Sequence, residues 1–145
     1  MIWTGISADD HTDFHFFERN MDSHIYIEDI VIPYSVPYKE FIGDNFLLMQ
    51  DNARSHVART VSDFLNEVNM QRMVWLAPDM NLIEHLWDIL KWRVRKHNAQ
   101  MLATLRNALQ EEWINLKQEE IKNLINSIPQ RIEELIKARG GNMRY

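Results

Sequence analysis

A short apolar run ends in a carboxylate near residue 50. Phe46-Leu47-Leu48-Met49 contains only apolar side chains, and the polar segment Gln50-Asp51-Asn52 follows it directly. An uninterrupted run of this length is typical of a central strand that is covered on both faces. In open α/β sheets, ligand sites gather at the carboxyl ends of such strands. The run therefore predicts an α/β fold in which Asp51 lies where a functional carboxylate is expected.

The first part of the chain predicts two strands and a helix before this run. Residues 1–7 and 13–19 are apolar segments on either side of a polar turn, and we expect them to pair as antiparallel strands. Ser23 is a suitable N-cap for a helix that Pro33 and Pro37 then break or kink.

The second part of the chain is predicted to be mostly helical. Ser55 can cap a helix with one apolar stripe, formed by Val57, Val61, Phe64, Leu65 and Val68. A short strand is expected over residues 73–76. Three further helices are expected: a long one marked by Ile83, Leu86, Trp87, Leu90 and Val94, one over 102–116, and one over 119–138 that Pro129 kinks or divides. We expect residues 1–98 to form the core, and residues 99–145 to form a helical C-terminal extension of the same domain.

Composition excludes several classes of protein. A chain of 145 residues fits a single domain with a substantial core, and the absence of cysteine excludes disulfides and thiolate zinc sites. No apolar run of about 18 residues and no signal-peptide pattern occurs, so a soluble, intracellular protein without membrane contact is expected. The net charge of -5 argues against a dedicated nucleic-acid-binding module.

One basic segment stands out against this acidic background. It reads Lys91-Trp92-Arg93-Val94-Arg95-Lys96-His97, with an aromatic residue inside the cationic run. Nucleic-acid surfaces combine these residue types. A solvated helix end, where cations favour the C-terminus, gives the same pattern. Both interpretations stay open.

The carboxylates Asp51 and Glu84 each have a structural and a functional interpretation. Asp51 can form an Asx-turn or cap a helix, or it can bind a ligand. Glu84 follows the core position Ile83, so it projects beside the buried stripe; the helix dipole or an ion pair would equally favour it there. His56 is suited to orienting a phosphate or covering a helix N-terminus, and Asp88 shares the helical face of Glu84.

Taken together, these motifs resemble those of a known family. Gln50-Asp51-Asn52-Ala53 with His56, Trp75, Pro78-Asp79-Met80-Asn81 and Ile83-Glu84-His85-Leu86-Trp87 resemble the DDE transposases of the mariner superfamily. The likeness extends over nearly the whole chain. The segment from Ile2 to Ser7 resembles the family's second core strand, and the segment from Arg139 to Tyr145 resembles the end of many members.

The resemblance implies an RNase H-like fold and a cut-and-paste DNA transposase domain that uses Mg²⁺ or Mn²⁺ for phosphodiester hydrolysis and strand transfer. Asp51 would be the second catalytic carboxylate and Glu84 the third, both as metal ligands, with Asn52 and His56 as accessory residues. Hard divalent cations prefer oxygen ligands, and two of them about 3.5–4 Å apart can support an in-line displacement. DNA, as transposon ends and target, would be the partner and the nucleus the location. The resemblance is also compatible with assembly of the chain into a homo-oligomer.

The chain also departs from the family pattern. The family's first catalytic aspartate lies on a strand before the segment that begins here at Met1, and its DNA-recognition helices also precede that segment. The stretch from Asp51 to Glu84 is slightly shorter than usual, and Leu82 replaces a customary proline. We therefore expect an N-terminally truncated fold without its first strand and a catalytic domain that is inactive alone. The alternative is a non-catalytic nucleic-acid- or protein-binding module derived from a transposase, in which Lys91, Arg93, Arg95 and Lys96 contact DNA.

Overall fold

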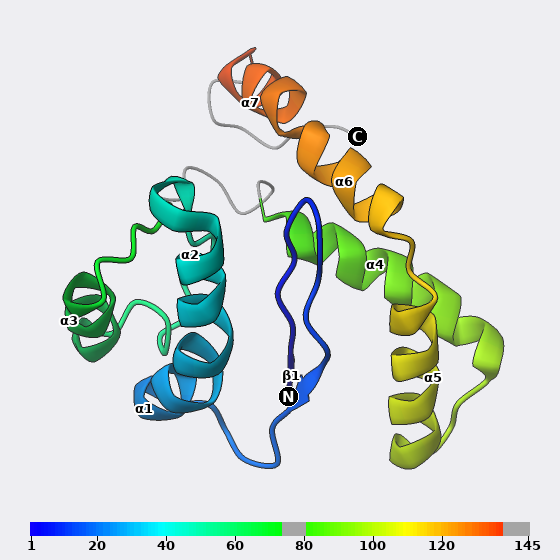
Figure 1. Ribbon diagram of the computed structural model, residues 1–145. Coiled ribbons are helices and arrows are strands. Elements are labelled where there is room, and N and C mark those ends of the chain that lie inside the picture. Colours follow the sequence, from blue (N-terminus) through cyan, green and yellow to red (C-terminus); the bar gives the residue numbers. More distant parts are fainter. Residues whose placement is uncertain (74–80, 138–145) are drawn as a thin grey trace. The chain divides into compact units, whose positions relative to one another are not determined.

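Helices dominate the computed structural model, which describes residues 1–73 and 81–137 (Figure 1). The chain forms two compact units. The first joins Met1–Trp3 to His15–Pro78, and the second joins Thr4–Phe14 to Asp79–Tyr145. The chain therefore passes between the two units within its N-terminal hairpin. The predicted division at residue 98 into a core and a helical extension stays a prediction.

The two N-terminal strands pair as predicted but are much shorter than expected. β1 (Ile2–Trp3) runs antiparallel to β2 (His15–Phe16), with Ile2 opposite Phe16. Beyond this ladder the backbone pairing is irregular: the Thr12 N–H donates to the Gly5 carbonyl at 2.9 Å, and Ile6 forms an isolated antiparallel bridge with His11. Threonine side chains add to it, because the Thr4 hydroxyl donates to the Thr12 carbonyl at 3.0 Å and the Gly5 N–H donates to the Thr12 hydroxyl at 2.8 Å. Such side chain–backbone bonds compete with a regular ladder.

A single helical run follows the hairpin, and the predicted break at Pro33 is wrong. α1 (Ser23–Tyr26) continues into the π-helix η1 (Ile27–Ser35), and α2 (Val36–Ile42) follows. Pro33 lies inside the π-helix and Pro37 lies in the first turn of α2. The wider π-helical turn bonds residues five apart, as from the Val36 N–H to the Val31 carbonyl. This changed spacing accommodates the proline ring, which in an α-helix would clash with the carbonyl four residues earlier.

Asp22, not Ser23, caps the start of this helical run. Its carboxylate accepts hydrogen bonds from the N–H groups of His24 and Ile25, both at 2.9 Å. The hydrogen bond from Ile25, opposed in part by desolvation and supported by the hydrogen bond from His24, holds the pKa of Asp22 below its ordinary value of 3.8. Asp22 is thus a charge-assisted cap for the helix N-terminus.

The lowered pKa of Asp22 predicts a pH-dependent contribution to stability. Because its folded pKa lies below the unfolded value, the contribution is fully present above about pH 4 and disappears as the pH falls through the folded pKa. Asp22→Asn keeps a capping side chain that does not titrate. Thermal unfolding of both proteins across the acidic range should show a wild-type advantage that shrinks toward low pH. A constant difference between the two proteins would contradict the charged cap.

The core of the first unit packs η1 and α1 against α3 (Arg59–Glu67). Its buried residues are Phe17, Ile25, Tyr26, Ile30, Val31, Val61, Leu65 and Met70. The predicted stripe is confirmed for Val61 and Leu65, which are buried, whereas Val57 is 44% exposed. Ala58 rather than Ser55 precedes the helix, because residues 53–57 form a separate turn in which the N–H groups of His56 and Val57 both reach the Ala53 carbonyl.

The predicted central strand over residues 46–49 is wrong. The described residues show only one isolated parallel bridge there, between Leu48 and Arg72. Leu47 is 47% exposed, so the run is not covered on both faces. Leu48 bonds the opposing segment through its N–H to the Gln71 carbonyl and its carbonyl to the Met73 N–H, and among the residues up to position 73 no regular ladder extends along the run. The strand predicted over 73–76 lies outside the described residues from position 74 onward, as does the motif at Trp75 and Pro78.

The helices of the second unit confirm the predictions from periodicity. They are α4 (Leu82–Val94), the 3-10 turn η4 (Arg95–His97), α5 (Leu102–Ile114), α6 (Gln118–Asn126) and α7 (Ile128–Lys137). Pro129 lies in the first turn of α7, so it divides the last predicted helix as expected. No helix among the residues that the structure describes is both long and apolar enough to cross a membrane.

Aromatic residues anchor the hairpin tip in the second unit. Phe14 stacks on Trp87 at 5.8 Å and on Trp113 at 4.8 Å between ring centroids. The Trp113 indole N–H donates to the Thr12 carbonyl at 2.9 Å. Trp113 is buried beside Leu86, Leu90, Leu116 and Ile121. The hairpin tip is thus part of this unit's core.

Candidate functional site

Asp51 lies in the loop between the apolar run and α3, and one of its two carboxylate oxygens accepts hydrogen bonds from neighbouring residues. Its Oδ1 accepts the Ala53 N–H at 2.9 Å and His56 Nδ1 at 2.5 Å. The first contact is the Asx-turn that the sequence allowed. No described residue hydrogen-bonds to Oδ2, and the Asp51 side chain is 49% exposed. The turn therefore orients the carboxylate and leaves Oδ2 available to bind a ligand.

His56 is buried between Asp51 and the first helix. Its ring lies on the Tyr26 ring, with centroids 4.1 Å apart. Only 10% of its side chain is exposed, and its Nε2 has no hydrogen-bond partner among the residues that the structure describes. Of the two predicted accessory residues, His56 is hydrogen-bonded to Asp51, whereas Asn52 is exposed.

Two further residues, Tyr26 and Gln50, complete this cluster. The Tyr26 hydroxyl donates to Gln50 Oε1 at 2.6 Å, and Gln50 Nε2 donates to the His56 carbonyl at 3.1 Å. Burial, and then the charge of Asp51, raises the pKa of Tyr26, so its hydroxyl stays a donor. The sequence assigned neither residue a role. The available signal was a tyrosine among apolar helix positions, because a buried tyrosine hydroxyl needs a partner.

Glu84 lies in the first turn of α4 and is exposed. Its backbone N–H bonds to the Asn81 carbonyl at 3.1 Å, and its carboxylate has no ion-pair partner in the described ranges 1–73 and 81–137. Asp88, one turn later, is also exposed. The neighbouring His85 is engaged with α7, because its Nε2 accepts a hydrogen bond from Arg131 at 2.5 Å. Glu84 is thus available to a ligand from outside the described residues.

Both carboxylates fit divalent cations by their chemistry. Each offers free oxygen atoms, the ligands that Mg²⁺ and Mn²⁺ prefer. Asp51 belongs to the first compact unit and Glu84 to the second. Within the part of the chain that the structure describes, no three acidic or histidine side chains form a metal-binding group. The predicted roles of Asp51, Glu84, Asn52 and His56 in metal binding therefore stay predictions.

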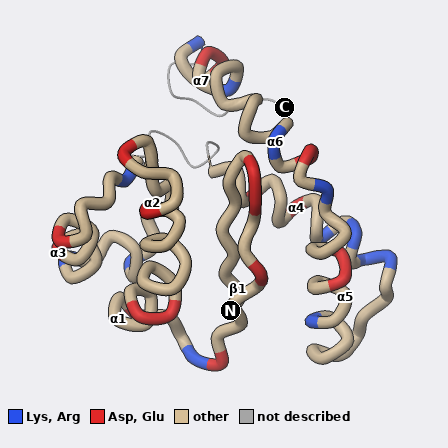
Figure 2. Tube along the Cα trace, viewed as in Figure 1, with Lys and Arg blue, Asp and Glu red and all other residues tan. Residues whose placement is uncertain are grey.

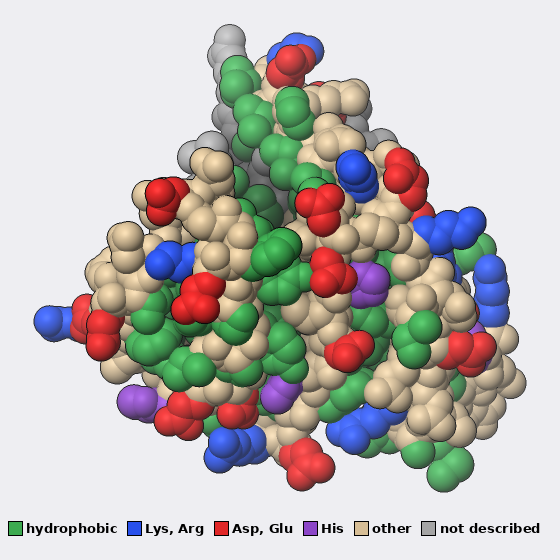
Figure 3. All heavy atoms as spheres, viewed as in Figure 1, with side chains coloured by type: hydrophobic (Ala, Val, Ile, Leu, Met, Phe, Trp, Pro, Cys, Tyr) green, Lys and Arg blue, Asp and Glu red, His purple; other side chains and the backbone are tan. Residues whose placement is uncertain are grey.

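The basic segment, whose Lys and Arg positions are blue in Figure 2, is only partly available for a partner. Arg93 is engaged with Glu120 of α6 at 2.5 Å, and His97 contacts Glu112 at 2.7 Å. By contrast, Lys91, Arg95 and Lys96 are exposed. Lys96 Nζ lies 3.9 Å from the ring centroid of Trp92, which is 60% exposed. Elsewhere on the face drawn in Figure 3, acidic and basic side chains are interspersed.

Comparison with known proteins identifies relatives along the whole chain. The chain is 26% identical over 149 residues to the transposable element Tc3 transposase of Caenorhabditis elegans, covering 100% of this chain and 45% of that protein. It is 26% identical over 148 residues to the Tcb2 transposase of Caenorhabditis briggsae, covering 54% of it. With the Tc1 transposase of Caenorhabditis elegans it shares 30% identity over 106 residues, which are 72% of this chain and 39% of that protein.

The chain spans about half the length of the curated relatives it matches. No family model matches the chain.

Solved structures establish the fold. The Mos1 transposase catalytic domain, in a structure with raltegravir and Mn, matches with a TM-score of 0.80 and 17% identity, over 99% of this chain and 76% of that one. A structure of the same domain with raltegravir and Mg gives the same TM-score and covers 75% of that chain. The predicted RNase H-like fold is confirmed.

Proposed function

Because the chain is a homologue of the Tc1/mariner transposases and has the fold of a mariner-type catalytic domain, we propose that it forms part of the catalytic domain of a cut-and-paste DNA transposase. The observation that carries this proposal is the alignment with transposases over the whole chain. DNA is then the substrate, as transposon ends and target, and the nucleus is the place of action.

Asp51 and Glu84 are the residues that would hold the divalent ions. Asp51 offers Oδ2 because Ala53 and His56 already hold Oδ1, and Glu84 offers both oxygens from an exposed helical turn. Bound Mg²⁺ or Mn²⁺ would activate a nucleophilic oxygen and stabilise the leaving one in phosphodiester cleavage. The chain's own contribution is to orient the two carboxylates and to supply their negative charge.

We further propose that the 145 residues alone cleave DNA poorly. Two carboxylates bind a metal pair weakly, and catalytic groups that act as a unit lose several orders of magnitude in rate when one is missing. Incubated with supercoiled plasmid and Mn²⁺, the chain should nick DNA no faster than its Asp51→Ala variant. Strong cleavage that disappears in Asp51→Ala would overturn this inactivity, and strong cleavage that survives both Asp51→Ala and Glu84→Ala would overturn the assignment of the carboxylates.

A second candidate function is nucleic-acid binding without catalysis. The observation in its favour is the exposed Trp92, with Lys96 over its ring and Lys91 and Arg95 beside it. Aromatic rings next to cations suit stacking on bases and contact with phosphates. Arg93 is the weakest member of the predicted set, because Glu120 already neutralises it.

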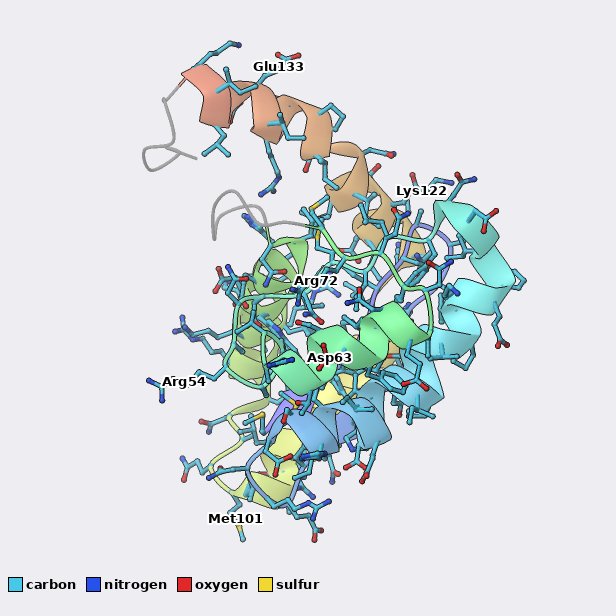
Figure 4. All side chains as sticks on the ribbon, turned by 90° about the vertical axis from the view of Figure 1, so that its left-hand side faces the viewer. Arg54, Asp63, Arg72, Met101, Lys122 and Glu133 are labelled. Carbon is cyan, nitrogen blue, oxygen red and sulfur yellow. The ribbon has the colours of Figure 1, made fainter. Side chains whose placement is uncertain are left out.

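This binding function predicts a salt-dependent affinity for DNA. Changing Lys91, Arg95 and Lys96 to alanine should weaken binding in a fluorescence anisotropy titration at low salt. Each phosphate contact contributes about 0.9 to the slope of log affinity against log salt, so the slope should fall by about 2–3. The matched control removes three exposed cations elsewhere: Arg54, whose side chain points away from the ribbon in Figure 4, Arg59 and Lys122. An equal loss in the control would contradict a specific basic surface.

A further inference from the structure

The contact between His56 and Asp51 is directional. Both donors to Asp51, the Ala53 N–H and His56 Nδ1, meet the same oxygen, Oδ1. An ionised carboxylate only accepts hydrogen bonds, so Nδ1 must carry the proton that it shares with Asp51. Two hydrogen bonds thereby hold the Oδ1 end of the carboxylate, and no described residue hydrogen-bonds to Oδ2.

The burial of His56 Nε2 determines the form of the ring. This atom is buried and has no partner among the described residues. A proton on Nε2 would create a buried donor without an acceptor among the described residues, which costs more than leaving a bare nitrogen. The favoured tautomer therefore carries its proton on Nδ1, where Asp51 Oδ1 accepts it. In that form His56 orients the Asp51 carboxylate.

Tyr26 and Gln50 hold His56 in this orientation. The Tyr26 ring covers one face of the imidazole, and the chain of hydrogen bonds from the Tyr26 hydroxyl through Gln50 ends on the His56 carbonyl. Tyr26 is 1% exposed and belongs to the core of the first unit. The orientation of Asp51 thus depends on a core residue of α1, although Asp51 itself lies in a loop.

We propose that His56 is a positioning residue for Asp51: its Nδ1–H fixes Oδ1 so that Oδ2 is directed at a divalent cation. This proposal rests on the proposed function, because it assigns His56 a part in the metal binding of Asp51. Partners of this kind, which hold a metal ligand without touching the metal, typically contribute about 10- to 100-fold to metal affinity. His56 is not itself a ligand, since its only free nitrogen is buried.

Three variants separate positioning from packing in a Mn²⁺ titration of the full chain, followed by water proton relaxation. His56→Phe keeps a ring against Tyr26 but has no donor, and it should weaken binding about tenfold or more. His56→Asn places an amide N–H where Nδ1 was, and it should restore affinity toward that of the wild type. His24→Phe is the control, because His24 is exposed in α1 of the same unit.

A long-range ¹H–¹⁵N spectrum of the metal-free wild type gives a second readout that requires no variant to fold. The ring of His56 should show its proton on Nδ1. A wild-type ring with its proton on Nε2, or equal Mn²⁺ affinity in the wild type and His56→Phe, would overturn the positioning role. The absence of Mn²⁺ binding by the wild type would overturn the proposed function, and the role of His56 with it.

Discussion

Replacing Asp51 by asparagine is expected to weaken Mn²⁺ binding to the chain about a hundredfold or more. Asparagine keeps an oxygen that can accept from Ala53 and His56, so the Asx-turn survives. The replacement removes the charge and turns the free Oδ2 into an amide that cannot bind a hard cation. Because a partner that only orients a ligand contributes about 10- to 100-fold, loss of the ligand itself should reach the upper end of that range or exceed it.

Glu84→Gln should reduce Mn²⁺ affinity to a similar extent, for the same chemical reason. Two exposed carboxylates serve as controls: Asp44 in the first unit and Glu133, labelled in Figure 4, in the second. Neither Asp44→Asn nor Glu133→Gln should change the affinity, and isothermal titration calorimetry measures all four variants. If the controls lose as much affinity as Asp51→Asn, binding follows net charge and the assignment of the two carboxylates fails.

Trp113→Ala is expected to destabilise the chain by about 3–5 kcal/mol, the usual result of truncating a buried tryptophan. Trp113 is 2% exposed, stacks on Phe14 at 4.8 Å and meets the edge of His11 at 4.9 Å. Removing the indole leaves a cavity between the hairpin tip and the helices. The Thr12 carbonyl also loses the hydrogen bond that the indole N–H donates at 2.9 Å. Urea unfolding followed by circular dichroism measures the loss.

The matched control for Trp113 is the exposed Trp92. Trp92 is 60% exposed, and surface substitutions of this kind usually change stability by less than about 0.5 kcal/mol. Trp113→Phe should fall between the two, because it keeps most of the stacking but loses the indole hydrogen bond to the Thr12 carbonyl, which then retains the Thr4 hydroxyl as a donor. A cost for Trp92→Ala as large as that for Trp113→Ala would contradict the assigned core.

Periodicity predicted the helices of the second unit because their burial is local in sequence. In α4, Leu86, Leu90 and Val94 recur every four residues, and all three are buried. The apolar run at 46–49 was misleading for a physical reason. Consecutive apolar residues indicate burial but cannot show whether a neighbouring strand supplies a ladder, and Leu48 forms a single isolated bridge with Arg72 among the described residues. Likewise, Pro33 excludes a regular α-helix but not the π-helix that forms there.

The candidate site was predictable only in part. The sequence indicated both carboxylates and allowed the Asx-turn at Asp51, because that turn depends on neighbouring residues. It did not indicate that His56 would be buried against Tyr26, which lies in a helix far earlier in the chain. The ion pair of Arg93 with Glu120 was missed for the same reason. Contacts between distant segments leave no periodic signal in either segment.

Broadening of backbone amide signals by Mn²⁺ in the ¹⁵N-labelled chain tests most directly the proposal that Asp51 and Glu84 are metal ligands. The account predicts that the amides around Ala53 and those around Glu84 broaden at the lowest Mn²⁺ concentrations, that Asp51→Asn abolishes the broadening around Ala53, and that Glu84→Gln abolishes the broadening around Glu84. Broadening confined to other acidic residues such as Glu111, or broadening around Ala53 that survives Asp51→Asn, would contradict it.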